Sequence, residues 1–209
     1  MGWLLDKIIE APSIGWLLDK IISKFSNPTA NWPQMGQQEL IYDLRLMTIN
    51  GYCLNSRLEL AEQFGKCAYT KRLGKEFLDL FYPDSGLILK FASSELWAIN
   101  AIVSRDSFHV RDNKMGVGKI SIIDISGRAH SLNERTTLRD LTTYLGKPVE
   151  SDKVGDDIGD EIVHTFILKK NHIETYHHPV TGRLLDIEIV EADETSQKDS
   201  ETKRTYSPL

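Results

Sequence analysis

The sequence predicts an α+β fold of two tandem units, each a strand, a helix and a three-stranded antiparallel meander, with the helix packed on one sheet face. Two stretches, residues 44–67 and 120–148, begin with alternating β-branched runs that end in glycine, at TING and DISG. Each continues into an amphipathic segment that ends in Gly-Lys, a common end for a helix. Three apolar runs separated by turns follow both segments. The repeated order of these features indicates a duplication.

A short amphipathic helix is expected before the first unit, within residues 1–25. The octapeptide GWLLDKII occurs there twice, at residues 2–9 and 15–22. The second copy gathers apolar residues on one helical face: Trp16, Leu18, Ile21, Ile22 and Phe25. Three interpretations stay open: a recent or artificial duplication, a helix packed on its own domain, or an anchor for a membrane surface or a partner groove. Residues 26–36, with two prolines and a glycine, read as a linker.

The first unit is placed at residues 37–105. Asn55 or Ser56 is a candidate cap for its helix, which ends at Phe64-Gly65-Lys66. The meander consists of AYTKRL, EFLDLFY and LILKFA, and a PDSG turn joins the last two strands. For the segment SSELWAINAIVSRD that follows, the periodicity does not decide between strand and helix.

The second unit is placed at residues 106–191. A hairpin through residues 113–118 would give it an extra leading strand, and Thr136 or Thr137 would cap its helix, with Asp140 three residues after Thr137. The strands EIVHTFIL, HIETYHH and RLLDIEIV follow, with a PVTG turn between the last two. Helix and sheet are expected to bury a shared set of apolar residues: Leu138, Leu141, Leu145, Phe166, Ile173, Leu185, Ile187 and Ile189. The opposite sheet face is left as a docking surface, and residues 192–209 are polar and expected to be disordered.

Composition restricts the classes of function. The chain has 209 residues and a net charge of −5, which does not favour nucleic acid as a partner. It has neither an apolar run long enough to span a bilayer nor a secretory signal pattern, and its two cysteines, Cys53 and Cys67, do not form a disulfide framework. These features predict a cytoplasmic protein with free thiols.

Residues capable of catalysis or metal binding do not form a recognisable pattern. Four histidines lie late in the chain, but His177 and His178 would point to opposite faces of a strand, so no metal site is expected. Cys53 and Cys67 are interpreted as buried thiols, because neither lies in a recognisable Cys–His arrangement. Nucleotide-binding and nucleophile-elbow motifs are absent from the sequence. We therefore expect a protein that is not an enzyme and has no cofactor.

Acidic residues are concentrated in residues 148–161, PVESDKVGDDIGDE, where one lysine accompanies six acids. This segment is interpreted as a solvated loop, as an acidic prong that meets a basic partner, or as a calcium loop, although the ordered calcium-loop spacing is absent. The prong hypothesis predicts a partner-binding set that includes an aromatic and a histidine from the neighbouring strand: Glu150, Asp152, Asp156, Asp157, Asp160, Glu161, Tyr176 and His178.

The segment TLRDLTTYLGKP at residues 137–148, followed by a meander, resembles a module of small bacterial immunity-type proteins from toxin–immunity pairs. In topology it is also similar to β-lactamase inhibitor protein, which has tandem units, and to small outer-membrane assembly lipoproteins. The first unit departs from the pattern, since Cys67 stands in place of the proline. The resemblance implies binding and inhibition of another protein, a cognate toxin or effector with a basic surface, with no catalytic residues. The alternative function is a membrane-surface adaptor or scaffold that uses the N-terminal helix.

Overall fold

The computed structural model describes residues 27–156, 159–169 and 171–191. The predicted N-terminal helix and the predicted disordered tail lie outside these residues. Within them the fold is mostly β, with one sheet of four strands and one of eight.

The smaller sheet has the order β2-β1-β7-β8. Its strands are β1 (Glu39–Asp43), β2 (Thr48–Ile49), β7 (Lys119–Ile123) and β8 (Ala129–Leu132). β1 and β7 pair in parallel over their whole length, although about 80 residues separate them in the chain. The two predicted units therefore share this sheet.

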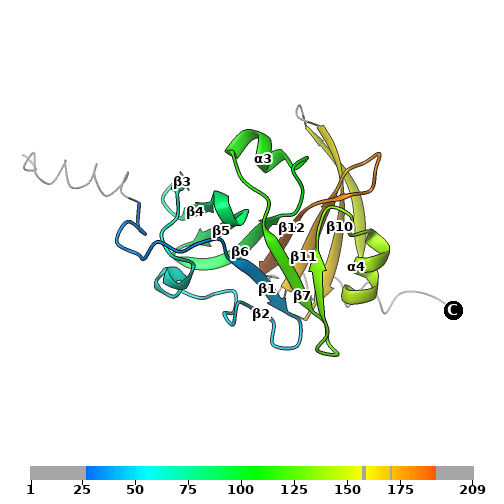
Figure 1. Cartoon of the computed structure of the whole chain (residues 1–209), viewed down its shortest axis with the longest axis horizontal. Coiled ribbons are helices and arrows are strands. Elements are labelled where there is room, and N and C mark those ends of the chain that lie inside the picture. The colour runs from blue at the N-terminus through cyan, green and yellow to red at the C-terminus, as the bar shows by residue number, and fades with distance from the viewer. Residues whose placement is uncertain (1–26, 157–158, 170, 192–209) are drawn as a thin grey trace, which may run out of the picture.

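The larger sheet has the order β3-β4-β5-β6-β12-β11-β10-β9, and all its neighbouring strands are antiparallel. Its first half consists of β3 (Tyr69–Leu73), β4 (Phe77–Tyr82), β5 (Leu87–Ala92) and β6 (Glu95–Ile102). Its second half consists of β9 (Glu150–Asp156), β10 (Gly159–Leu168), β11 (Asn171–His177) and β12 (Leu184–Glu191). Figure 1 shows the two halves on opposite sides of the molecule, with β1 and β7 between them in the view.

The strands β6 and β12 join the halves at the centre of the larger sheet. β6 pairs with β12 from Ala98–Val190 to Ile102–Asp186. Both strands are buried along most of their length, on both faces, as the nearly continuous apolar runs AINAI and LLDIEIV require. Strands whose side chains are buried on both faces favour central positions, which explains why the two meanders fuse at these strands.

The main core lies on one face of the larger sheet. The smaller sheet, the 3-10 helix η1 (Leu58–Phe64) and α4 (Leu138–Leu145) pack there around buried side chains that include Tyr42, Phe91, Leu141 and Phe166. The opposite face is covered in part by α3 (Phe108–Asn113), where Val110 packs against a small cluster that contains Phe81, Ile88 and Met115. Figure 1 shows α3 and α4 at separate places on the molecule.

The predicted fold class is wrong. The sequence suggested two separate α+β units, each a strand, a helix and a three-stranded meander, whereas the described residues are mostly β and four strands from each half form one continuous sheet. The leading strands β1 and β7 are not part of this sheet and pair with each other in the smaller sheet. Both differences arise from pairings between distant parts of the chain, which local periodicity does not record.

Individual elements were predicted with mixed success. The helix α4 is confirmed with its cap: Thr137 accepts a hydrogen bond from the Asp140 backbone N–H, and the Asp140 carboxylate accepts one from the Thr137 backbone N–H. The helix of the first unit is a 3-10 helix with no side-chain cap, so the expectation for Asn55 and Ser56 was wrong. The undecided segment after β5 is the strand β6.

The expected hairpin and extra strand around residues 108–118 were also wrong. This segment begins with the helix α3, because the Ser107 hydroxyl accepts a hydrogen bond from the His109 backbone N–H and caps the first turn. The apolar set predicted for the second unit is in the main core apart from Leu185, which is buried but lies next to the bulge at Tyr176/His177.

Phe166→Ala is expected to destabilise the fold by about 3–5 kcal/mol, because this fully buried ring lies in the main core and its removal leaves a cavity. Urea unfolding followed by circular dichroism measures the change in the free energy of unfolding. Val180→Ala is the control, since Val180 is 86% exposed in the turn before β12. Similar losses for the two variants would contradict this description of the core.

Candidate functional site

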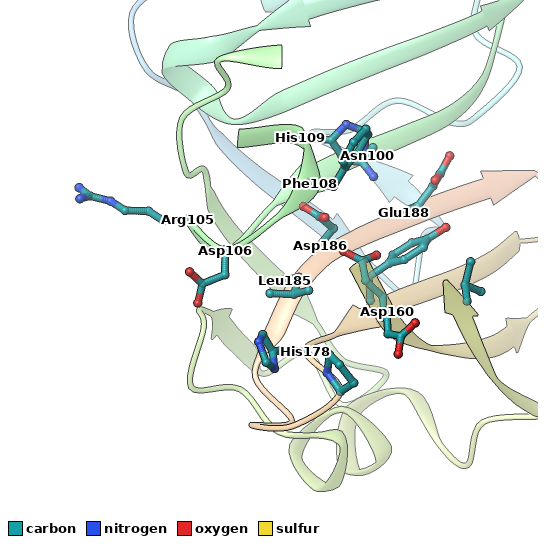
Figure 2. A pocket seen from close by; sticks show the side chains of 14 residues that line it. Asn100, Arg105, Asp106, Phe108, His109, Asp160, His178, Leu185, Asp186 and Glu188 are labelled. Atoms are coloured by element: carbon teal, nitrogen blue, oxygen red, sulfur yellow. The ribbon is translucent and has the colours of Figure 1, made fainter. Parts of the chain in front are cut away.

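A pocket of about 590 Å³ lies on the face of the larger sheet that is opposite the main core. Its floor comes from β6, β11 and β12, and its walls come from the start of α3 and from the β9–β10 hairpin. Figure 2 shows this hollow from close by, with Asp186 on β12, Asp160 on β10 and His109 on α3 around it.

Strand alternation makes the floor polar. Ile187 and Ile189 of β12 belong to the main core, so Asp186 and Glu188, which alternate with them, point to the other face. Asn100 of β6 lies directly opposite Glu188, and Tyr176 of β11 lies directly opposite Asp186. Three adjacent strands therefore place an amide, two carboxyls and a phenol next to one another.

Ser107 fixes the wall at α3 against this floor. Its hydroxyl accepts a hydrogen bond from the His109 backbone N–H at 3.1 Å and donates one to Oδ2 of Asp186 at 2.7 Å. The serine that caps α3 is thus also bound to β12. This contact holds Asp106, Phe108 and His109 at the rim of the pocket.

Asp186 is the most perturbed carboxyl of the site. It is 3% exposed, and its Oδ1 has no hydrogen-bond partner among the described residues. Burial raises the pKa of Asp186 to about 7, and the negative charges of Glu161 and Glu188 act in the same direction. The hydrogen bond from Ser107 and the charge of Lys90 oppose this shift.

The other floor residues have different partners. Glu188 accepts from the Lys90 ammonium at 2.6 Å, and this ammonium lies 5.8 Å from the centre of the Trp97 ring. The Tyr176 hydroxyl donates to Glu174 at 2.7 Å, and burial, followed by the nearby carboxylates, raises the pKa of this phenol. Asn100 is 2% exposed, and its Oδ1, like that of Asp186, has no partner in the described part of the chain.

The structure brings together four of the eight residues predicted to bind a partner: Asp160, Glu161, Tyr176 and His178 all line the pocket. The acidic segment is not a loop, because it forms β9 and the start of β10, with Glu150 opposite Thr165 and Asp156 opposite Gly159. Glu150 and Asp152 are exposed on this edge strand and do not line the pocket.

Some predicted residues cannot be placed at the site. Asp157 lies outside the described residues, as do the five apolar residues of the N-terminal helix, Trp16, Leu18, Ile21, Ile22 and Phe25. The membrane-adaptor alternative depends on that helix and stays a prediction.

Sequence reasoning missed Asn100, Ser107, Asp186 and Glu188. The signal for two of them was present in β12, where LLDIEIV places acids at alternate positions of an otherwise apolar strand. In a strand with this pattern, the acids lie on one face and the apolar residues on the other, so one face of the sheet is polar at this point. Asn100 gives the same signal within AINAI, whereas Ser107 was hidden by the incorrect strand assignment.

The remaining polar candidates lie elsewhere. The rings of His164 and His177 contact each other on the core side of the sheet, with centroids 5.1 Å apart. No group of three or more His, Cys, Asp or Glu side chains in the described ranges is arranged to hold a metal ion. Both cysteines are free; Cys67 is buried as expected, but Cys53 is exposed, so that half of the prediction was wrong. None of the helices in residues 27–156, 159–169 and 171–191 is long and apolar enough to cross a membrane.

Comparison with known proteins does not assign this chain to a family. Neither a family model nor a curated protein matches this chain. A solved structure of an extracellular protein containing an SCP domain, from Bacillus anthracis str. Ames, is similar at 8% identity and a TM-score of 0.40. The match covers 70% of this chain and 46% of that chain, so it spans about half the length of that protein. A likeness at this level carries no functional argument, and the resemblance to immunity-type proteins stays a prediction.

Asp186→Asn is expected to change how stability depends on pH. The folded carboxyl, with a pKa of about 7, keeps a proton that the unfolded chain, with a pKa of 3.8, releases. The wild-type protein therefore loses stability as the pH rises from about 4 to 7, and the amide removes on the order of 2–4 kcal/mol of this loss. Urea unfolding between pH 4 and pH 8 measures the effect.

Other charged or ionisable groups lie around the pocket: Lys90, Arg105, Asp106, His109, Asp160, Glu161, His178 and Glu188. The wild type and Asp186→Asn share these groups, so the difference between their curves isolates Asp186. Asp84→Asn, an exposed aspartate outside the pocket, is the control and should run parallel to the wild type. Parallel curves for Asp186→Asn as well would contradict the raised pKa.

Proposed function

We propose that this protein binds another protein through the pocket, that the partner presents a basic segment, and that binding occludes a functional surface of the partner. The observation that carries the proposal is the excess of carboxyl groups over basic groups in the lining. Five carboxyl side chains, Asp106, Asp160, Glu161, Asp186 and Glu188, line the pocket together with Arg105. Opposite charges across an interface speed encounter and select partners, so such a hollow favours a cationic surface.

The position of the pocket also suits a macromolecule. It opens on a sheet face that α3 covers only in part, and its rim carries exposed apolar side chains. Val154, which is 52% exposed, lines it from the edge strand, and Val180 lies beside the lining residues His178 and Pro179. Apolar contacts at the rim would lengthen the residence of a partner that charge has attracted.

Inhibition of a cognate toxin is the specific form of this proposal, and the role is one of binding without catalysis. It rests on the acidic concave face and on the similarity of residues 137–148 to immunity-type modules. Cytoplasmic residence belongs to the same proposal and is supported by the two free thiols, Cys53 and Cys67.

The test starts with the products of neighbouring reading frames. Each is co-expressed with the full chain, and co-purification and killing of the host are measured with and without it. A neighbour that binds and that kills only when this protein is absent supports the proposal. If no neighbour is bound or toxic, the proposal fails.

For a partner found in this way, Asp106→Asn/Glu161→Gln is expected to slow association about tenfold at low salt, with a much smaller effect at 0.5 M salt. Stopped-flow fluorescence or surface plasmon resonance measures the association rate. Glu62→Gln/Asp84→Asn removes the same number of charges from exposed positions away from the pocket and should leave the rate nearly unchanged. Equal effects of the two double variants would show that net charge, and not this pocket, directs binding.

A further inference from the structure

The floor of the pocket has two hydrogen-bond acceptors with no donor. Oδ1 of Asp186 and Oδ1 of Asn100 are both buried, both belong to residues that line the pocket, and neither has a partner among the described residues. A buried acceptor without a donor costs free energy, and a ligand that supplies N–H or O–H groups removes this cost. A ligand rich in hydrogen-bond donors therefore suits this floor.

The charge around these acceptors selects a cation. The hydrogen bond from Ser107 satisfies one oxygen of Asp186 and leaves the other available. Asp160 and Glu161 line the same hollow. Figure 2 shows Arg105 pointing away from it, so the side chain of this arginine does not fill the pocket.

The spacing of the acceptors distinguishes between the two cationic side chains. Asn100 faces Glu188 across the β6–β12 pair, and Asp186 lies two residues further along β12. Diagonal neighbours of this kind are roughly 7 Å apart at their Cα atoms. A guanidinium presents five N–H donors in a flat fork and can donate to two separate acceptors at once, whereas an ammonium is a compact group. An ammonium is also already supplied to Glu188 by Lys90.

Aromatic side chains give the second reason to prefer a guanidinium. Tyr176 lies opposite Asp186 on β11, and Phe108 lines the wall at α3. A planar guanidinium stacks on aromatic faces while its edge donates hydrogen bonds, so the two kinds of contact are compatible in one pose.

We propose that the pocket is an arginine site, in which a guanidinium donates hydrogen bonds to Asp186 and Asn100 beside the Tyr176 ring. The inference rests on the proposed function, because it names the side chain by which the basic partner is held. It also extends that function, since the same site binds a free arginine derivative.

The test uses the full chain and a small probe, so that it does not depend on a partner. Nα-acetyl-arginine methylamide is titrated into 15N-labelled protein at pH 8 and low salt, with chemical shifts as the readout. The lysine and citrulline analogues are the comparison probes; citrulline retains the shape of arginine without the charge. We expect a Kd on the order of 1 mM for the arginine probe.

The expected result is that the lysine probe binds at least about tenfold more weakly, that the citrulline probe does not bind, and that the shifts map to β6, β12 and the start of α3. Equal binding of arginine and lysine probes, or shifts elsewhere, would overturn the assignment. Preferential binding of spermidine would overturn it as well and would identify a polyamine site instead.

Two variants address the role of Asp186. Asp186→Asn should weaken binding of the arginine probe at least about tenfold, while Asp84→Asn should not change it. Wild-type binding should be about tenfold tighter at pH 8 than at pH 6, because Asp186 must lose its proton to pair with the cation. His109 and His178 also face the pocket, together with Lys90, Glu161 and Glu188, so the pH effect counts as support only where Asp186→Asn abolishes it.

The two proposals fail in different ways. If a toxic neighbour binds through Asp106 and Glu161 but the arginine probe does not bind, the arginine site is wrong and the proposed function stands. If the probe binds as described but no neighbour is bound, the proposed function fails while the arginine site is supported.

Discussion

The pairing of β6 with β12 is the interaction on which the rest of the structure depends. It joins two four-stranded halves into one sheet and so brings the main core and the pocket into one body. On the core face these strands contribute Ile99, Ile187 and Ile189. On the other face they contribute Asn100 and Asp186. Because strand side chains alternate, the register that completes the core also sets the arrangement of the polar floor. A shift of the strand register by one residue would turn the apolar core residues toward the pocket and the polar floor residues toward the core.

Polar groups at this central position reduce the stability of the sheet. Two acceptors are buried without donors from the described residues, and a carboxyl is held where burial favours its neutral form. A purely apolar pair of strands would cover this face more stably, as the neighbouring cluster of Phe81, Ile88 and Ile102 under α3 does. Places where a chain departs from the arrangement that best suits its fold are where function is expected. On this face of the sheet, one half is apolar and covered by α3, and the other half is polar and lines the pocket. This contrast is the strongest structural argument for a site.

Sequence reasoning found the strands better than it found their partners. The meanders, the two P-x-[ST]-G turns and the Thr137 cap follow from local chemistry, and all three are present. The pairings of β1 with β7 and of β6 with β12 join residues about 80 to 90 apart, and no local pattern specifies them. The error at Ser107 had another cause, since a short alternating run was interpreted as a strand although a capping serine preceded it. Half of the predicted site was found: Asp160 and Glu161 because acids were counted, and Tyr176 and His178 because the neighbouring strand was included. Asp186 and Glu188 of the floor were missed because they lie within an apolar strand.

The acidic segment at residues 150–161 has two structural roles. Some of its acids lie on the edge strand β9 and others line the pocket, and only the second group belongs to the site. β9 is an edge strand of the larger sheet, and its outer side has unpaired backbone groups that could recruit another strand. Glu150, Asp152 and Lys153 are exposed there, and Lys153 forms an ion pair with Asp160 across the hairpin. Charges at an edge discourage non-specific strand pairing. This role accounts for Glu150 and Asp152, and no binding partner has to be invoked for them. Asp160 and Glu161 differ because they line the pocket beside Asp186. The carboxyl groups available to the proposed basic partner are therefore those of β10 and β12, and the acidity of β9 follows from its place at the end of the sheet.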